Sequence, residues 1–191
     1  MRGHHLFNKE SLFSDDKLRE LVTLGFESEE LDYKLYVDLD SKKCSLEICS
    51  DVMAMANTRG GYIIIGVAND FSPVGLPPEF HIDQARIQQI VGTYLKPVPE
   101  SKYLEKTLEI NETRKKFAFI YVKPSDEPIV ACKEGNYTEH PTNKTISCFR
   151  SADIFVRKGS SSQRADSDDL RRLIQKLAKK KHRPNEKSPA N

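Results

Sequence analysis

The chain has 191 residues, of which 30% are charged and 38% are apolar, and its formal net charge is +2. This length suffices for one domain with a substantial core, and the balance is that of a globular protein rather than a disordered one. No window approaches the roughly 20 consecutive apolar residues of a transmembrane helix, which argues against a membrane protein.

The two halves of the chain differ in charge. Residues 1–100 carry 10 Lys/Arg against 16 Asp/Glu, a net of −6, whereas residues 101–191 carry 20 against 12, a net of +8. The basic half is a candidate surface for a polyanion, and the acidic half is a candidate for carboxylate chemistry. Chance segregation on a solvated surface is the alternative, and charge alone favours it.

The two ends of the chain also stand apart. Met1–His5 reads as the remnant of an expression tag, so residues 1–14 are assigned to a tag remnant and N-terminal extension. Residues 182–191 have the composition of a basic, disordered tail. Residues 15–181 are expected to form a single domain.

The cysteines indicate the compartment. Cys44, Cys49, Cys132 and Cys148 lack C-x-x-C spacing, and no signal peptide follows the tag. Both features favour a reduced, cytoplasmic chain, with the nucleus left open for a eukaryotic source. Zinc is not expected, because two cysteines spaced around His140 do not match a zinc finger or ribbon.

The first third of the chain predicts a helix, a strand and a second helix. Residues 15–24 start with two aspartates and stop at a glycine, as a short helix does. Residues 31–36 alternate apolar with polar, which predicts a half-buried strand with Asp32 and Lys34 on one face. Ser41 is expected to cap the next helix, which runs to Asn57.

A Gly60-Gly61 turn follows that helix and leads into residues 62–67, which are uninterrupted apolar and β-branched. Glycine supplies the positive φ of a helix C-cap and a tight turn. The apolar run predicts a central strand buried on both faces, which delivers Asp70 near its far end. No nucleotide cofactor is expected, because the G-K-[ST] of a Walker loop does not follow the glycines.

The remaining elements alternate in type. Asp83 is expected to cap a helix that ends before Pro97. The last helix is expected to be capped near Ser167 and to run into the basic residues 179–183. Residues 133–147 are polar and rich in turn formers, which predicts an exposed loop. Strands are predicted at residues 103–110, 117–123, 128–132 and 153–158. The chain is therefore expected to be an α+β protein with a mixed, mostly antiparallel sheet and flanking helices.

One group of polar residues suits phosphodiester hydrolysis. Glu27, Asp32 and Asp70 could hold one or two hard cations, and Lys34 could neutralise the charge that develops on a phosphate. Such pairs are also common on the polar face of any strand, and the pattern alone favours that simpler reading. The site carries a condition: if residues 31–36 and 62–67 were parallel neighbours, Asp70 would lie at the opposite end from Glu27.

A second group suits phosphate binding. Arg157 and Lys158 end a strand and are followed by a glycine, three serines and Arg164. Cations and exposed amides near the start of a helix are what phosphates bind. An ordinary strand-to-helix connection is the equally favoured alternative. Candidate contacts with nucleic acid are Arg59, Arg157, Lys158, Arg164, Lys179, Lys180 and Lys181, although a basic helix end is more often simply solvated.

Taken together, three segments resemble the Schlafen-type AlbA-like domain. They are Glu27-Ser-x-x-Leu-Asp-Tyr-Lys34, Ala54-x-Ala-Asn-Thr-x-Gly-Gly-Tyr-Ile-Ile-Ile-Gly-Val67 and Phe155-Val-Arg-Lys-Gly-Ser-Ser-Ser162. The resemblance runs from about residue 25 to 178 and implies a Schlafen core-like fold that binds nucleic acid. It also implies a divalent-metal-dependent endoribonuclease, of the kind in the animal branch, that acts on structured RNA such as tRNA.

The resemblance assigns roles to the acidic residues. The family's three carboxylates match Glu27, Asp32 and Asp70, which implies Mg²⁺ or Mn²⁺ as the cofactor. Asp32 stands where glutamate is usual, and Ala68-Asn69-Asp70 stands where consecutive aspartates are common, so the match of the third acid is the weakest.

Three functions remain open at this point. The first is the endoribonuclease, the second a non-catalytic DNA- or RNA-binding module of a regulator, and the third a protein-interaction domain. RNA or DNA is the expected partner, and no membrane is expected. A homo- or hetero-oligomer with another Schlafen-like domain is left open.

Overall fold

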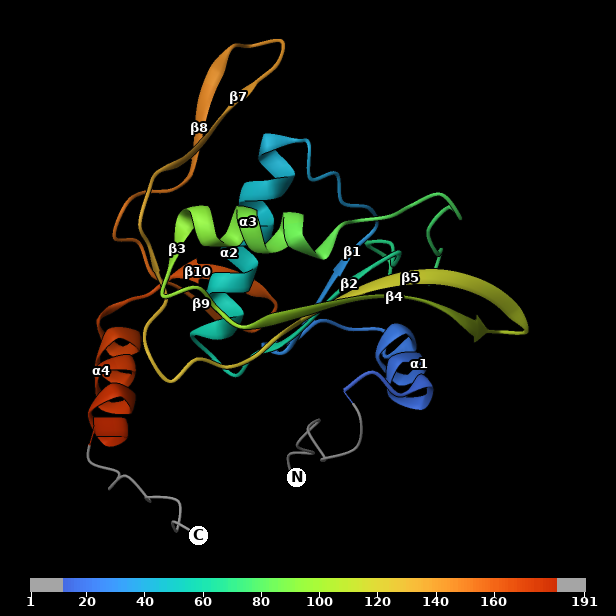
Figure 1. Ribbon diagram of the computed structural model, residues 1–191, viewed down its shortest axis with the longest axis horizontal. Coiled ribbons are helices and arrows are strands. Elements are labelled where there is room, and N and C mark those ends of the chain that lie inside the picture. The colour runs from blue at the N-terminus through green and yellow to red at the C-terminus, as the bar shows by residue number, and fades with distance from the viewer. Residues whose placement is uncertain (1–11, 182–191) are drawn as a thin grey trace, which may run out of the picture.

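The computed structural model describes residues 12–181 (Figure 1). The expected tag remnant at Met1–His5 and the tail at residues 182–191 lie outside this range. The helices are α1 (Asp15–Thr23), α2 (Lys42–Ala56), α3 (Gln84–Tyr94) and α4 (Ser167–Lys181). The strands are β1 (Leu31–Lys34), β2 (Gly61–Ile65), β3 (Leu95–Lys96), β4 (Ser101–Ile110), β5 (Thr113–Val122), β6 (Val130–Ala131), β7 (Gly135–Glu139), β8 (Lys144–Phe149), β9 (Phe155–Lys158) and β10 (Ser161–Arg164).

A four-stranded sheet in the order β1-β2-β5-β4 forms the centre of the fold. β1 and β2 are parallel, and the other neighbours in this sheet are antiparallel. Three two-stranded ribbons, β3 with β6, β7 with β8 and β9 with β10, complete the β structure. The predicted α+β fold with a mixed, mostly antiparallel sheet is therefore confirmed.

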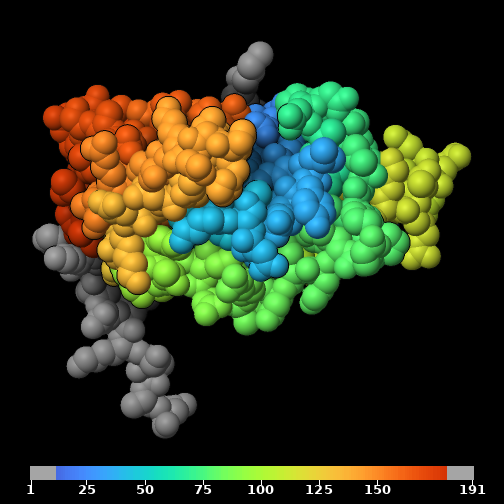
Figure 2. Space-filling model, turned by 90° about the horizontal axis from the view of Figure 1, so that it is seen from above, coloured from blue at the N-terminus to red at the C-terminus, as the bar shows by residue number. Residues whose placement is uncertain are grey.

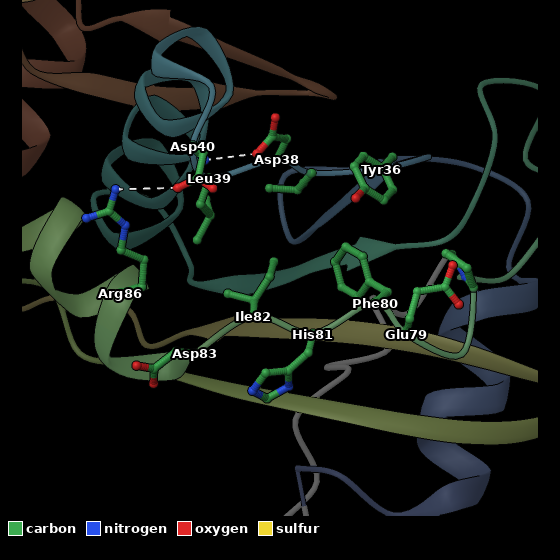
Figure 3. A pocket seen from close by; sticks show the side chains of 12 residues that line it. Tyr36, Asp38, Leu39, Asp40, Glu79, Phe80, His81, Ile82, Asp83 and Arg86 are labelled. Carbon is green, nitrogen blue, oxygen red and sulfur yellow. Dashed lines mark hydrogen bonds and ion pairs between the residues drawn. The ribbon is translucent and has the colours of Figure 1, made fainter.

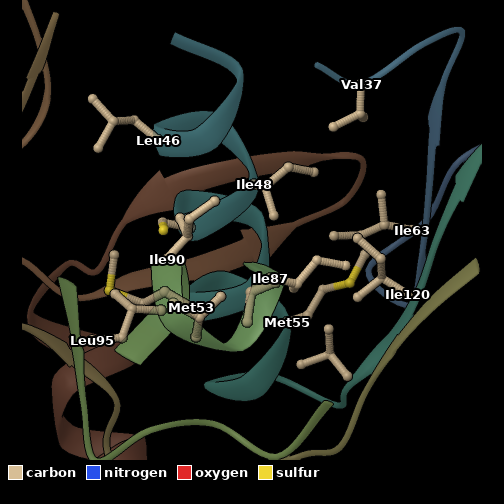
Figure 4. Packing of buried hydrophobic residues seen from close by; sticks show 14 of the residues in the cluster. Val37, Leu46, Ile48, Met53, Met55, Ile63, Ile87, Ile90, Leu95 and Ile120 are labelled. Atoms are coloured by element: carbon tan, nitrogen blue, oxygen red, sulfur yellow. The ribbon is translucent and has the colours of Figure 1, made fainter. Parts of the chain in front are cut away.

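Alternate residues of β2 enter two separate cores. Ile63 and Ile65 face α2 and α3, in the core drawn in Figure 4, whereas Tyr62 and Ile64 face α1. The strand is fully buried, as the apolar run predicts, because helices cover both faces of the sheet at this point.

The Gly60-Gly61 turn requires glycine at both positions, because the backbone of a neighbouring segment lies close to each Cα. Gly60 has φ 73°, and a Cβ there would lie 2.5 Å from the carbonyl oxygen of Val122. Gly61 has φ 146°, and a Cβ would lie 2.2 Å from the carbonyl oxygen of Glu30. Any side chain would push β2 away from its neighbours, so these glycines set the sheet's spacing as well as the turn.

Asn57, just before the turn, joins three segments. Its Nδ2 donates to the carbonyl oxygens of Ile129 at 2.8 Å and Phe155 at 3.0 Å, and its Oδ1 accepts from the Ile129 amide at 2.7 Å. The next residue, Thr58, accepts the Arg157 amide through Oγ1 at 2.9 Å. The Ala-Asn-Thr-x-Gly-Gly sequence thus positions β9 and the segment before β6 against the end of α2.

The predicted helix caps at Ser41 and Asp83 are confirmed, since their side chains accept from the amides of Cys44 and Ala85. The cap of the last helix, expected near Ser167, is Asp166, the residue before α4. Asp166 Oδ1 accepts from the amides of Asp168 at 2.9 Å and Asp169 at 3.0 Å.

The exposed loop predicted at residues 133–147 is wrong, because β7 and β8 form a hairpin there (Figure 1). Its residues are polar and largely exposed, so the strands show no apolar alternation. Backbone hydrogen bonds across the ribbon hold them instead. The connection expected after β9 is likewise a strand, since β10 turns back and pairs with it.

None of the helices in residues 12–181 is long and apolar enough to cross a bilayer. The thiols of all four cysteines are free. The cytoplasmic location stays a prediction.

Candidate functional site

β1 presents Asp32 and Lys34 to the face of the sheet covered by α2 and the β9–β10 ribbon. Both side chains lie on the same face as Ile63 and Ile65, their register partners on β2. The predicted shared face is therefore confirmed, but it is not a half-exposed polar face. Asp32 is only 7% exposed, which leaves its charge dependent on protein partners.

Arg157 supplies the main partner of Asp32. Its Nη1 lies 3.1 Å from Asp32 Oδ1, and the side chain of Arg157 is 1% exposed. Nη2 donates to the carbonyl oxygen of Ser28 at 3.0 Å. This arginine, predicted to contact nucleic acid, is instead buried against β1.

Lys34 joins two carboxylates from different elements. Its Nζ lies 2.9 Å from Asp32 Oδ2 and 2.7 Å from Oδ2 of Asp51 on α2. Ser162 Oγ on β10 donates to Asp51 Oδ1 at 2.8 Å. We call these five residues, Asp32, Lys34, Asp51, Arg157 and Ser162, the Asp32 network.

The two acids and two bases of the Asp32 network balance in charge. Burial alone would lower the pKa of Lys34, but the carboxylates of Asp51 and Asp32 outweigh it and raise the pKa, so the amine stays protonated. Burial raises the pKa of Asp51, and Lys34 opposes that shift. A buried and compensated set of this kind fixes the relative positions of β1, α2, β9 and β10.

Glu27 reaches β1 from the loop before it. Its Oε1 accepts the backbone amide of Tyr33 at 3.1 Å. Tyr33 occupies the opposite face of the sheet from Asp32, within the α1 core, and its ring lies 5.9 Å from that of Phe71.

Asp70 closes a turn after β2. Its Oδ1 accepts from the amide and the hydroxyl of Ser72 at 3.0 and 2.6 Å, and these hydrogen bonds lower its pKa. Because β1 and β2 are parallel, Asp70 follows the end of the sheet opposite to the one that Glu27 precedes. The arrangement that the sequence identified as unfavourable for a shared site is therefore the one adopted.

The structure does not bring the three predicted metal ligands together. Asp32 is paired with Arg157 and Lys34, Glu27 with a β1 amide, and Asp70 with Ser72. Within residues 12–181, no three His, Cys, Asp or Glu side chains are placed to hold one metal ion. As a set, Glu27, Asp32 and Asp70 do not fit the Mg²⁺ or Mn²⁺ centre that the resemblance implies, because ligands of one ion must converge on it.

Most of the cations predicted to meet nucleic acid have acidic partners. Lys158 Nζ lies 2.9 Å from Asp169, and Arg164 Nε lies 2.9 Å from Asp153. Arg59 lies 3.6 Å from Glu29 and is 69% exposed, so it remains accessible. Lys179 is exposed near the end of α4, and Lys180 and Lys181 complete that helix.

A different set of cations is accessible. Lys42, Lys96, Lys133 and Arg150 are exposed, and none forms an ion pair with a carboxylate of residues 12–181. With Tyr94 they form what we call the basic edge. Lys42 Nζ lies 5.0 Å from the centre of the Tyr94 ring.

Backbone contacts bring the basic edge together from four segments. The Cys132 amide donates to the Tyr94 carbonyl oxygen, Lys96 pairs with Val130, and the Ala152 amide donates to the Ala131 carbonyl oxygen. In Figure 2 the β7–β8 hairpin, the start of α2 and α3 share one face of the molecule. Sequence reasoning missed this edge because its cations come from segments that are far apart in the chain.

Asp51 and Ser162 were also missed. Ser162 carries no distinguishing signal. Asp51 does, because in the run Ile48 to Ala56 of a helix the only other polar residue is Ser50, and an acid buried there requires a partner.

Comparison with known proteins gives a family and a distant structural likeness. The chain is similar to the crystal structure of the DIP2311 protein from Corynebacterium diphtheriae, with 18% identity and a TM-score of 0.46 over 72% of this chain and 25% of that one. It thus spans about a quarter of that protein's length. The search of the curated proteins found no match. The family model described as Schlafen, AlbA_2 matches residues 27–166, so the chain belongs to that family.

Proposed function

We propose that this domain binds nucleic acid and that the basic edge contacts the phosphate backbone. Membership of the Schlafen, AlbA_2 family, which suggests a function related to nucleic acid, is the observation that carries the proposal. The basic edge supports it, because four exposed cations without a carboxylate partner gather on one face. Cations already paired with carboxylates must break those pairs before they can bind phosphate.

The chemistry of the basic edge suits backbone contact rather than base readout. Lysine and arginine neutralise phosphates and release counterions, which gives affinity that depends on salt but little on sequence. Tyr94 is partly buried and packs its ring against Phe149, with ring centres 5.7 Å apart. It therefore positions Lys42 and is not free to stack a base on both sides.

Fluorescence anisotropy with labelled tRNA and a labelled DNA duplex tests the proposal. Over 50–200 mM salt, the logarithm of the association constant should fall linearly with the logarithm of salt concentration, with a slope of about −3 to −4 for four phosphate contacts on duplex DNA. Absence of binding to either probe at 50 mM salt would overturn the proposal. Stronger binding of one probe assigns the preferred nucleic acid.

A metal-dependent endoribonuclease that acts on structured RNA is the second candidate, and family membership again favours it. For Asp32 to serve as a metal ligand, its carboxylate would have to leave Arg157 and Lys34. Glu27 and Asp70 would have to approach it from outside the Asp32 network.

Cleavage of tRNA in the presence of Mn²⁺ tests this candidate without unfolding the protein. Glu27→Gln and Asp70→Asn are the suitable variants, because neither residue belongs to the buried Asp32 network. Loss of cleavage in both variants, with tRNA affinity retained, would support a three-carboxylate centre. Cleavage that persists in both, or is absent from the wild type, would rule out this set of ligands.

A further inference from the structure

A cavity whose charge is opposite to that of the basic edge lies just after the end of β1. It is a cavity of about 370 Å³ between the β1–α2 connection and the loop that leads into α3 (Figure 3). Tyr36 to Asp40 form one wall, and Pro77, Glu79 to Asp83 and Arg86 form the other. This volume falls within the range of side-chain and small-ligand pockets.

The cavity has an aromatic side. Tyr36 is 58% exposed and packs edge-on against Phe80, with ring centres 5.3 Å apart and an angle of 73° between the planes. Figure 3 shows the two rings on the same side of the cavity. A large aromatic residue held in place by its neighbour, with most of its surface in solvent, is typical of a binding surface rather than of a core.

The charge of the cavity is strongly negative. Its walls carry the carboxylates of Asp38, Asp40, Glu79 and Asp83 against the single guanidinium of Arg86, a net of −3 when the imidazole of His81, which contacts Glu105, is left out. Arg86 Nη2 lies 3.8 Å from Asp40 Oδ1, too far for a hydrogen bond.

Several carboxylate oxygens of the cavity remain available to accept hydrogen bonds from a ligand. Asp38 and Asp83 each accept one backbone amide, from Asp40 and from Ala85. Within residues 12–181, the carboxylate of Glu79 has neither a hydrogen bond nor an ion pair. The cavity therefore combines an exposed ring with the carboxylates of Asp38, Glu79 and Asp83, none of which forms an ion pair within residues 12–181.

From this combination we infer that the cavity binds an arginine side chain from a basic segment of a partner protein. A guanidinium is planar, donates in parallel to a carboxylate and stacks on an aromatic ring, so one group meets both features of the cavity. A phosphate backbone is repelled by the same four acids. The inference is therefore independent of the proposed nucleic-acid function and concerns a different surface.

Binding of a fluorescein-labelled hexa-arginine peptide, measured by anisotropy at 50 mM salt, tests the inference on the full chain. Glu79→Gln and Tyr36→Ala should each weaken binding by about threefold, the size expected for one exposed charge pair or one exposed cation–π contact. Glu112→Gln is the matched control, because it removes one exposed negative charge at the β4–β5 turn, outside the lining of the cavity. It should leave the affinity within experimental error.

The same measurement with hexa-lysine separates specific recognition from general attraction. Hexa-lysine should bind several-fold more weakly, because an ammonium group cannot donate in parallel to a carboxylate. Equal loss in Glu79→Gln and Glu112→Gln, an unchanged affinity in Tyr36→Ala, or no binding at all would overturn the inference. Affinity for tRNA should be unchanged in Tyr36→Ala, so failure here is distinguishable from failure of the nucleic-acid proposal.

Discussion

Arg157 and Asp32 lie 125 positions apart in the chain and meet as a buried ion pair, with Nη1 3.1 Å from Oδ1. From the sequence we predicted different roles for these two residues. Arg157 was expected to bind phosphate, and Asp32 was expected to bind a metal ion. Their contact gives both a structural role, because neither charge can be buried without the other.

Removal of the Asp32 carboxylate from this ion pair should lower the free energy of unfolding. Asp32→Asn leaves Arg157 buried with less compensation, and we expect the free energy of unfolding to fall by about 3 kcal/mol. Urea denaturation followed by circular dichroism measures this. Glu100→Gln is the control, since Glu100 pairs with Lys123 in solvent and its removal should cause no measurable change. A stable Asp32→Asn protein would show that the Asp32 network is dispensable.

Gly61, in the Gly-Gly turn, and Gly159, between β9 and β10, should tolerate a side chain very unequally. Gly61→Ala puts a Cβ 2.2 Å from the Glu30 carbonyl oxygen, so β1 and β2 must separate. We expect a loss of more than about 3 kcal/mol or failure to fold. Gly159→Ala shares the positive φ but meets no atom within 4 Å, so only backbone strain of about 1 kcal/mol is expected. Similar thermal midpoints for the two variants would contradict this account.

Low pH should lower the free energy of unfolding, in part through protonation of Glu105. Burial acts to raise the pKa of Glu105, but hydrogen bonds from Lys116, Tyr103 and the Ile82 amide outweigh burial and lower the pKa to about 2. The folded state therefore holds the carboxylate ionised where the unfolded chain, with a pKa near 4.5, takes up a proton. The stabilisation is present above pH 4.5 and is lost as the pH falls towards 2.

The variant Glu105→Gln isolates this contribution. The difference in the free energy of unfolding between wild type and variant should be about 1–2 kcal/mol at pH 7, because solvent that reaches the site screens part of the interaction. It should shrink as the pH falls from 5 to 2.5. A difference that stays constant over this range would mean that Glu105 stabilises the fold by means other than its charge.

The basic edge should set the salt dependence of nucleic-acid binding. Lys133→Gln combined with Arg150→Gln should reduce the magnitude of the salt slope by about 2. Arg19→Gln combined with Lys123→Gln is the control with the same change in net charge, because both cations already pair with carboxylates. If the control pair lowers the slope as much as the test pair does, binding depends on net charge and not on the basic edge.

The sequence determined the parts of this protein that depend on neighbouring residues. Local patterns predicted the caps at Ser41 and Asp83, the buried strand β2 and the strands β4 and β5, and the motif around Gly60-Gly61 identified the family. Each depends on periodicity, capping or backbone conformation, and these act over a few residues. Among the strands of residues 12–181, β3, β7, β8 and β10 were not predicted. β3 has two residues, and polar strands on an exposed ribbon carry no apolar alternation.

The tertiary structure alone decided which charged residues meet. The parallel pairing of β1 with β2 put Glu27 and Asp70 at opposite ends of the sheet. The packing of Arg157 on β9 against β1 buried this arginine next to Asp32. The same folding assembled the basic edge from four segments and the acidic cavity from two. The order of the strands and the path of the chain between them determine which charged residues become partners. A pattern of neighbouring residues contains neither piece of information.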